Sequence, residues 1–200
     1  YLEVIPSQTR ALEYLGRMTR QYPDARLRIG GHSKGGNLSV YAAVKAPAAV
    51  QDRIVRVYNN DGPGFSHDMV DSAAYRRVAD KLHTYIPESS IVGILLEHAE
   101  DYAVIDSSNR SIMQHEPMSW NVEGPRFVHL GQRSPMGKVS DDLLRQWIGS
   151  MTPQEREQFT DALFDILSMS GKTRTLEDLR AGGLAKMAAL LKQYNGADEK

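Results

Sequence analysis

The residues best suited to chemistry are a serine and its neighbours, Gly31-His-Ser-Lys-Gly35. Gly-x-Ser-x-Gly is typical of a nucleophile elbow, a sharp turn between a strand and a helix that exposes the serine hydroxyl. Leu27 and Ile29 precede the turn as a short strand would, and apolar residues at helical spacing follow it. The sequence therefore predicts Ser33 as a nucleophile, with a glycine-rich structural turn as the alternative.

The glycines on both sides of the serine have a steric explanation, because strand and helix are expected to approach too closely there for a side chain. The first N–H groups of the helix and the positive end of its dipole would point at the serine and favour an oxyanion. We predict the backbone N–H of Lys34 as one oxyanion donor. The Lys34 side chain either steers an anionic group or is simply solvated, and the second is the simpler interpretation.

Two later stretches, Asn60-Asp-Gly-Pro-Gly-Phe65 and Gln114-His-Glu-Pro-Met-Ser-Trp120, accompany the elbow. Together with Gly-His-Ser-Lys-Gly-Gly-Asn-Leu they resemble alpha/beta-hydrolases related to the class 3 lipases. They are closer still to a family of largely uncharacterised bacterial lipase-like hydrolases. The resemblance extends from about Tyr1 to Ser170, and it implies a hydrolase fold and a reaction class without naming a substrate.

A serine becomes a strong nucleophile when a base, usually a histidine, accepts its proton. In alpha/beta-hydrolases the chain order is serine, acid, histidine, so the base is expected well after Ser33. Of the six histidines, His115 follows the last predicted strand in a turn-like Gln-His-Glu-Pro loop. It also matches the position of the base in the resembling lipases. We predict His115 as the base, with His98 as its main competitor and an exposed loop histidine as the simple alternative.

Several carboxylates are candidates for the acid that orients the histidine. Asp61 follows the strand after the elbow, in a turn similar to the one that carries the acid in some lipases. In the class 3 lipases the acid follows the next strand, where it aligns roughly with Ser90, close to Glu88. We predict Asp61, with Glu88 and then Asp101 as alternatives, and an Asx-turn as the purely structural role of Asp61.

A second oxyanion donor normally comes from a loop after an earlier strand, but one helix is all that the pattern predicts before the elbow. Several strands precede this point in the resembling family, and the sequence begins with Tyr1. From this resemblance we expect that upstream strands are missing from the sequence. We expect association with a missing N-terminal segment, or a second donor from elsewhere in the chain.

Apolar residues after the elbow predict an acyl pocket, although core packing explains them equally well; they are Phe65, Ile91, Ile94 and Leu95. His32 adjoins the nucleophile and is predicted to contact substrate. Glu97, His98, Glu100 and Asp101 carry metal-ligating groups, but consecutive acidic residues do not share one face, so a solvated turn is the expected structure. The sequence predicts no metal and no cofactor.

Strand and helix patterns alternate before residue 122. Helices are predicted over 7–21, from the elbow to 45, and over 70–80, and strands over 27–31, 54–58, 82–86 and 101–106. This alternation predicts an α/β fold, with a mostly parallel sheet flanked by helices. Composition becomes almost wholly helical near Ser140, and Thr152-Pro-Gln-Glu155 predicts a capping box. We therefore divide the chain into a hydrolase core, 1–139, and a helical C-terminal segment, 140–200.

Composition limits the classes of function. The 200 residues are 41% hydrophobic, which suits one core, and the formal net charge of −1 gives no reason to expect nucleic acid as a partner. No apolar run approaches the roughly 20 residues of a transmembrane helix. The absence of cysteine excludes a thiol nucleophile and fits a reducing compartment, so we expect a cytoplasmic location.

These residues together predict a serine hydrolase that cleaves carboxylic esters of a lipid or another small molecule through an acyl-enzyme. A non-catalytic or incomplete hydrolase-fold binding module is one alternative. An acyltransferase that uses the same Ser33–His115–Asp61 triad is the other alternative. Oligomeric state stays open.

Overall fold

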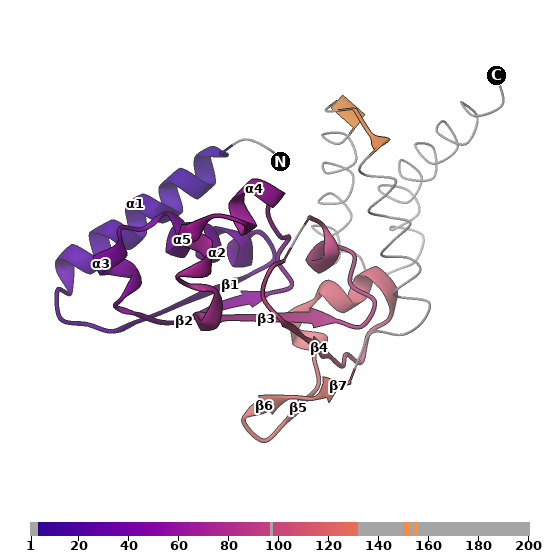
Figure 1. The fold of residues 1–200 in the computed structure, drawn as a ribbon. Coiled ribbons are helices and arrows are strands. Elements are labelled where there is room, and N and C mark those ends of the chain that lie inside the picture. Colours follow the sequence, from indigo (N-terminus) through magenta and orange to yellow (C-terminus); the bar gives the residue numbers. More distant parts are fainter. Residues whose placement is uncertain (1–3, 97, 132–149, 153, 156–200) are drawn as a thin grey trace. The chain divides into compact units, whose positions relative to one another are not determined.

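The computed structural model describes residues 4–96, 98–131, 150–152 and 154–155. The chain divides into two units, residues 1–141 and 142–200. The helices and strands from α1 to β7 all belong to the first unit (Figure 1).

The first unit is built on a five-stranded sheet with the order β1-β2-β3-β4-β7. Its strands are β1 (Leu27–His32), β2 (Ile54–Asn60), β3 (Leu82–Pro87), β4 (Tyr102–Ile105) and β7 (His129–Leu130). The first four are parallel, and β7 runs antiparallel to β4. The prediction of an α/β fold with a mostly parallel sheet is confirmed. The carboxyl ends of β1, β2 and β3 meet along one edge, which is where open α/β sheets place their sites.

Helices connect these strands. They are α1 (Pro6–Gln21), α2 (Lys34–Lys45), α3 (Ala48–Gln51), α4 (His67–Val70) and α5 (Ala73–Arg76), with short 3₁₀ segments η1 (Ala79–Lys81), η2 (Val92–Ile94), η3 (Ser111–His115) and η4 (Pro117–Ser119). Proline at the first position suits the start of α1, and Pro47 prevents α2 from continuing.

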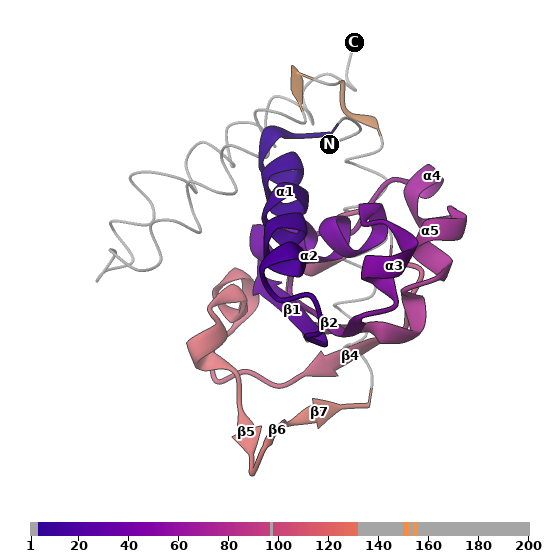
Figure 2. The same cartoon turned by 90° about the vertical axis from the view of Figure 1, so that its left-hand side faces the viewer.

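The helix that follows the elbow lies directly on the sheet. Contacts join α2 to β1 and β2, and α1 packs against α2 (Figures 1 and 2). The face of α2 that meets the strands is made of small and β-branched residues, among them Val40, Ala43 and Val44, each almost fully buried. Because these side chains are short, the backbone of α2 can lie close to β1, and this closeness sets the geometry of the elbow.

Beyond β4 the chain forms a small hairpin of β5 (Val122–Glu123) and β6 (Arg126–Phe127), which pair antiparallel. It lies at the end of the unit away from α1 (Figure 2). Gly124, at a φ of 57°, supplies the left-handed backbone that such a tight turn requires.

The predicted helix over 70–80 is wrong as a continuous element. The Ser72 hydroxyl donates to the carbonyl of Met69, at the end of α4, and accepts the backbone N–H of Tyr75, at the start of α5. This hydroxyl offers the backbone local partners that compete with helical hydrogen bonds. The chain therefore stops at α4 and restarts at α5.

The capping box predicted at Thr152 is present. The Glu155 carboxylate accepts the Thr152 N–H at 2.7 Å, and the Thr152 hydroxyl accepts the Glu155 N–H at 3.3 Å. The bond from the Thr152 backbone, together with the one from its hydroxyl, lowers the pKa of the Glu155 carboxyl. The other helices predicted after residue 140 lie outside the described residues.

In the described part of the chain, none of the helices has both the length and the apolar character of a membrane span.

Gly31 and Gly36 are tightly packed at the elbow, and they are not the pair that the sequence predicts. A Cβ on Gly31 would lie 2.3 Å from the carbonyl carbon of Gly35, and a Cβ on Gly36 would lie 2.2 Å from Asn59 Oδ1. A Cβ on Gly35 would meet nothing within 4 Å. The steric expectation is therefore right at Gly31 and wrong at Gly35. A side chain at Gly35 would have space, and it is the backbone of Gly35 that leaves no space for a side chain at Gly31.

We predict that Gly31→Ala destabilises the fold by about 1–3 kcal/mol, because the new methyl group collides with backbone that cannot rotate away. Gly35→Ala is the matched control and should change the free energy of unfolding by less than about 0.5 kcal/mol. Urea denaturation of both variants measures the difference. Equal stability of the two variants would contradict the packing described for the elbow.

Candidate active site

Ser33 joins β1 to α2 in a strained conformation. Its φ is 56° and its ψ is −127°, a region that residues other than glycine rarely adopt and that costs on the order of 1–3 kcal/mol. Its N–H donates to the carbonyl of Asn60 at 2.9 Å, and its carbonyl accepts the N–H of Gly36 at 2.9 Å. The predicted order of strand, strained serine and helix is present, and contacts from both β2 and α2 hold the serine in place.

His115 and Asp61 form a buried hydrogen bond. His115 Nδ1–H donates to Asp61 Oδ2 at 2.7 Å, and the two side chains are 7% and 0% exposed. A carboxylate at Nδ1 fixes the proton on that nitrogen and leaves Nε2 free to act as a base. The sequence predicts these two residues as base and acid, and the structure brings them together although they are 54 positions apart.

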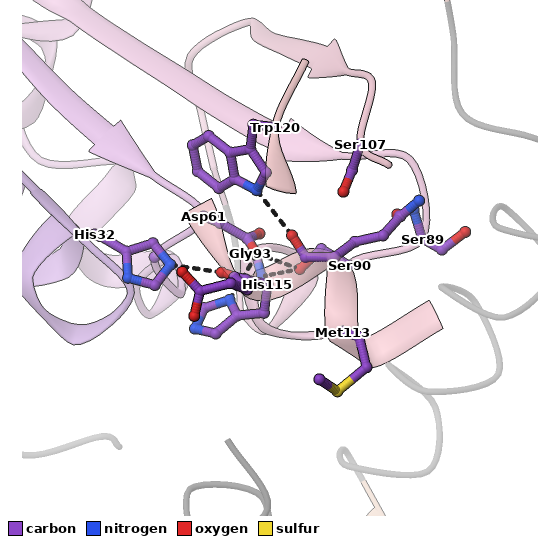
Figure 3. A network of polar contacts seen from close by, with 12 residues as sticks. His32, Asp61, Ser89, Ser90, Gly93, Ser107, Met113, His115 and Trp120 are labelled. Carbon is purple, nitrogen blue, oxygen red and sulfur yellow. Dashed lines mark hydrogen bonds and ion pairs between the residues drawn. The ribbon is translucent and has the colours of Figure 1, made fainter. Parts of the chain in front are cut away.

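The same Asp61 oxygen has a second donor. The Ser90 hydroxyl, three residues after β3, donates to Asp61 Oδ2 at 2.6 Å. The backbone N–H of Asp61 donates to the carbonyl of Tyr85, also in β3, at 2.8 Å, and Asp61 itself has a φ of 54°. Figure 3 shows Ser90 and His115 meeting at this carboxylate. The ends of β2 and β3 together orient the acid.

His32 holds the loop that carries His115. Its Nε2–H donates to the backbone carbonyl of His115 at 2.8 Å, and the two rings lie 4.5 Å apart between centroids (Figure 3). Burial lowers the pKa of His32, and the neighbouring His115 ring lowers it further. A neutral His32 that donates from Nε2 therefore connects the elbow to the base.

The loop around His115 has further anchors, which the sequence analysis missed. Gln114 Oε1 accepts the N–H of Ser89 at 2.7 Å, and the indole N–H of Trp120 donates to the Gln114 carbonyl at 2.8 Å. Both groups belong to Gln-His-Glu-Pro-Met-Ser-Trp, but nothing in the residues of this motif alone indicates that its glutamine contacts the segment after β3.

The contact between Ser33 and His115 is indirect. Within the described residues, no hydrogen bond joins Ser33 Oγ to His115, and the connection runs through the adjacent His32. Catalytic hydrogen bonds are often long in structures without substrate. The arrangement can supply a base and a nucleophile from neighbouring segments.

Residues 1–165 match a protein family described as Mbeg1-like. The chain belongs to the Mbeg1-like family. A search of curated proteins finds no match. The matched range contains the elbow, Asp61 and His115, so the whole candidate site lies in the part of the chain that the Mbeg1-like family shares.

Among the described residues, the competing acids of this Mbeg1-like chain do not pair with the histidine. Glu88 is half-buried and Asp101 is exposed, and in the described part of the chain neither makes a hydrogen bond to His115. Asp61 does not form an Asx-turn, because its Oδ2 bonds Ser90 and His115 and, among the described residues, its Oδ1 has no hydrogen-bond partner. The N–H of Gly62 donates to Asn59 Oδ1 instead, at 3.0 Å. Asp61 is therefore the carboxylate that the geometry favours.

His98, the competing base, pairs with another residue. Its Nδ1 lies 3.3 Å from Glu100 Oε1, and its Nε2 lies 2.8 Å from the carbonyl of Gly93. These contacts occupy both ring nitrogens, so neither is left to take a proton from Ser33.

The residues predicted to bind substrate or an oxyanion have different environments. Phe65 is 5% exposed and packs edge-to-face on Tyr75, so core packing accounts for it, whereas Ile91 and Leu95 are half-buried. The Ile94 side chain lies outside what the structure describes. Lys34 is exposed, and within the described residues no hydrogen bond uses its backbone N–H at the start of α2.

We predict that His32 titrates with a midpoint below the ordinary histidine value of about 6.5. The pKa of His32 is lower in the folded than in the unfolded chain, so the unfolded chain binds more protons between the two values. The His32 contribution to stability is therefore fully present above the unfolded pKa of about 6.5 and is lost as pH falls from there through the lower pKa of the folded chain. Imidazole NMR signals followed against pH test this, with His32→Gln as the assignment control. Glutamine keeps an amide donor for the His115 carbonyl but does not titrate. A midpoint at or above the ordinary value would contradict the buried, neutral His32.

Proposed function

We propose that this chain is a serine hydrolase that cleaves carboxylic esters through an acyl-enzyme. The observation that supports it best is the buried Asp61–His115 hydrogen bond, formed beside a serine held in the strained elbow conformation. A buried carboxylate on Nδ1 of a histidine is the arrangement that makes Nε2 a base for a serine.

In the proposed reaction, Ser33 Oγ attacks the ester carbonyl while His115 Nε2 takes its proton. Asp61 stabilises the imidazolium that forms, and the backbone N–H of Lys34 donates to the oxyanion. His115 then protonates the departing alcohol, and water resolves the acyl-enzyme by the same route in reverse. The Ser33–His115 hydrogen bond forms when substrate binds.

The proposed substrate is an ester of a lipid or another small molecule. Ile91 and Leu95 are half-buried apolar side chains on the segment that follows Ser90, and they are the residues we propose to line an acyl site.

An acyltransferase would use the same groups and differ in the hydroxyl that reaches the acyl-enzyme. The cytoplasmic location and the association with an upstream segment remain predictions.

A hydrolase-fold binding module is the second candidate. It is favoured by one observation, that Ser33 Oγ and His115 share no hydrogen bond among the described residues. Such a module would keep the elbow for its packing and would not activate the serine.

A fluorophosphonate probe separates the two candidates. The hydrolase proposal predicts one covalent adduct by intact-mass spectrometry on the wild-type chain and none on Ser33→Ala, because an activated serine attacks phosphorus as it attacks a carbonyl. His115→Gln should also prevent labelling. A folded wild-type chain that stays unlabelled would favour the binding module.

The identity of the acid has its own test. We predict that Asp61→Asn lowers kcat for nitrophenyl esters by up to about 10⁴-fold, because the amide cannot hold the proton on His115 Nδ1 as a carboxylate does. Glu88→Gln and Asp101→Asn are the matched controls and should stay within about threefold of wild type, since in the described part of the chain neither side chain makes a hydrogen bond to the histidine. A larger loss in either control than in Asp61→Asn would show that the acid is wrongly assigned.

A further inference from the structure

A second buried histidine–carboxylate pair lies behind the first. The side chains of His98 and Glu100 are 4% and 3% exposed, and His98 Nδ1 lies 3.3 Å from Glu100 Oε1. Thr84 in β3 and Tyr75 in α5 also donate their hydroxyls to the Glu100 carboxylate. Burial acts to raise the pKa of Glu100, but His98 and the two hydroxyls outweigh it and the pKa is lowered. Glu100 is therefore a fixed carboxylate that holds one side of the His98 ring.

The other nitrogen of the His98 ring contacts the turn that packs against Asp61. His98 Nε2 lies 2.8 Å from the carbonyl oxygen of Gly93, in η2. Since a carbonyl can only accept, Nε2 is the donor. The Glu100–His98 pair thus anchors Gly93 through its carbonyl.

Gly93 and Ser90 bring this turn against both oxygens of Asp61. Ser90 donates its hydroxyl to Oδ2, and a Cβ on Gly93 would lie 2.3 Å from Oδ1. The Gly93 N–H points at Ser90 Oγ, 3.4 Å away. Residues 90–93 are in direct contact with the carboxylate, and Figure 3 shows Ser90 and Gly93 beside Asp61 and His115.

The orientation of Asp61 is sensitive to this turn. Oδ1 has no hydrogen-bond partner among the described residues, so the carboxylate is oriented by the bonds to Oδ2 and by the backbone packed against Oδ1. A shift of Gly93 would let the carboxylate rotate and lengthen its bond to His115.

We propose that His98 is a positioning residue for the catalytic acid, because its Nε2–H, donated to the Gly93 carbonyl, holds residues 90–93 against Asp61. His98 acts through Gly93 and touches neither Ser33 nor His115. The role in catalysis rests on the proposed function. The placement of Asp61 does not.

Two substitutions at His98 separate its two contacts. The amide of His98→Gln reaches about as far as Nε2, so this variant keeps a donor for Gly93 and loses the one to Glu100. The amide of His98→Asn matches Nδ1, so this variant keeps the Glu100 contact and loses the one to Gly93. Thr84→Val is a further control, since it removes one donor to Glu100 and leaves the His98–Gly93 bond in place.

The proposal predicts that His98→Asn lowers the rate constant for fluorophosphonate labelling of Ser33 by about 10- to 100-fold, the loss expected when a catalytic group is misplaced by a remote change. His98→Gln and Thr84→Val should remain within about threefold of wild type. A purely structural role predicts the reverse order, since His98→Gln leaves the buried Glu100 with one donor fewer. Equal losses in both His98 variants, or no loss in either, would overturn the proposal.

Imidazole nitrogen NMR gives a readout that needs no activity. In wild type both ring nitrogens of His98 should carry a proton, because each faces an acceptor, and His115 should be the Nδ1–H tautomer. His98→Asn should mix the His115 tautomers, whereas His98→Gln should not. A wild-type His98 with Nε2 unprotonated would overturn the proposal even if His98→Asn fails to fold. If wild type is not labelled but the tautomers behave as predicted, the hydrolase proposal fails and the positioning of Asp61 by His98 stands.

Discussion

The hydrogen bond between Asp61 and His115 is the constraint on which the rest of the site depends. A fully buried carboxylate is costly unless donors face it, and removing one partner of such a pair typically costs about 3–5 kcal/mol. Asp61 obtains its donors from His115 in η3 and from Ser90 after β3, while its own N–H bonds the carbonyl of Tyr85. Satisfying this one side chain therefore requires β2, β3 and the η3 loop to meet at the carboxyl edge of the sheet.

The elbow depends on the same meeting point. Ser33 takes its unfavourable backbone angles because Asn60, the residue before Asp61, accepts its N–H, and because α2 lies close enough on β1 for Gly31 to touch the backbone of Gly35. His32, next to Ser33, donates to the backbone carbonyl of His115 and so fixes the position of His115 relative to the elbow. The strained serine is thus held by Asn60, the residue next to the buried Asp61, at the end of β2.

Local spacing predicted the parts of this site that are encoded locally. The Gly-x-Ser-x-Gly pattern after a short apolar strand identified the elbow, and Asp61 was predicted because it follows the next strand. The partners of Asp61 depend on long-range packing, so Ser90 appeared as a position that lacks an acid, whereas in the fold it donates to one. His98 appeared as a rival base for the same reason, because nothing nearby in sequence indicates that Thr84 and Tyr75 bury Glu100 beside it. The break in the predicted helix over 70–80 came from one serine hydroxyl that periodicity does not register.

A crystal structure of the chain after reaction with a fluorophosphonate tests the roles of Ser33, His115 and Asp61 together. If these three residues form a catalytic triad, phosphorus is bonded to Ser33 Oγ, a phosphoryl oxygen lies about 2.7–3.1 Å from the backbone nitrogen of Lys34, and His115 Nε2 is within hydrogen-bond distance of the adduct, with Nδ1 still bonded to Asp61. An adduct on another residue, or one from which His115 Nε2 is turned away while the Asp61 bond persists, would contradict the assignment of these residues as a catalytic triad.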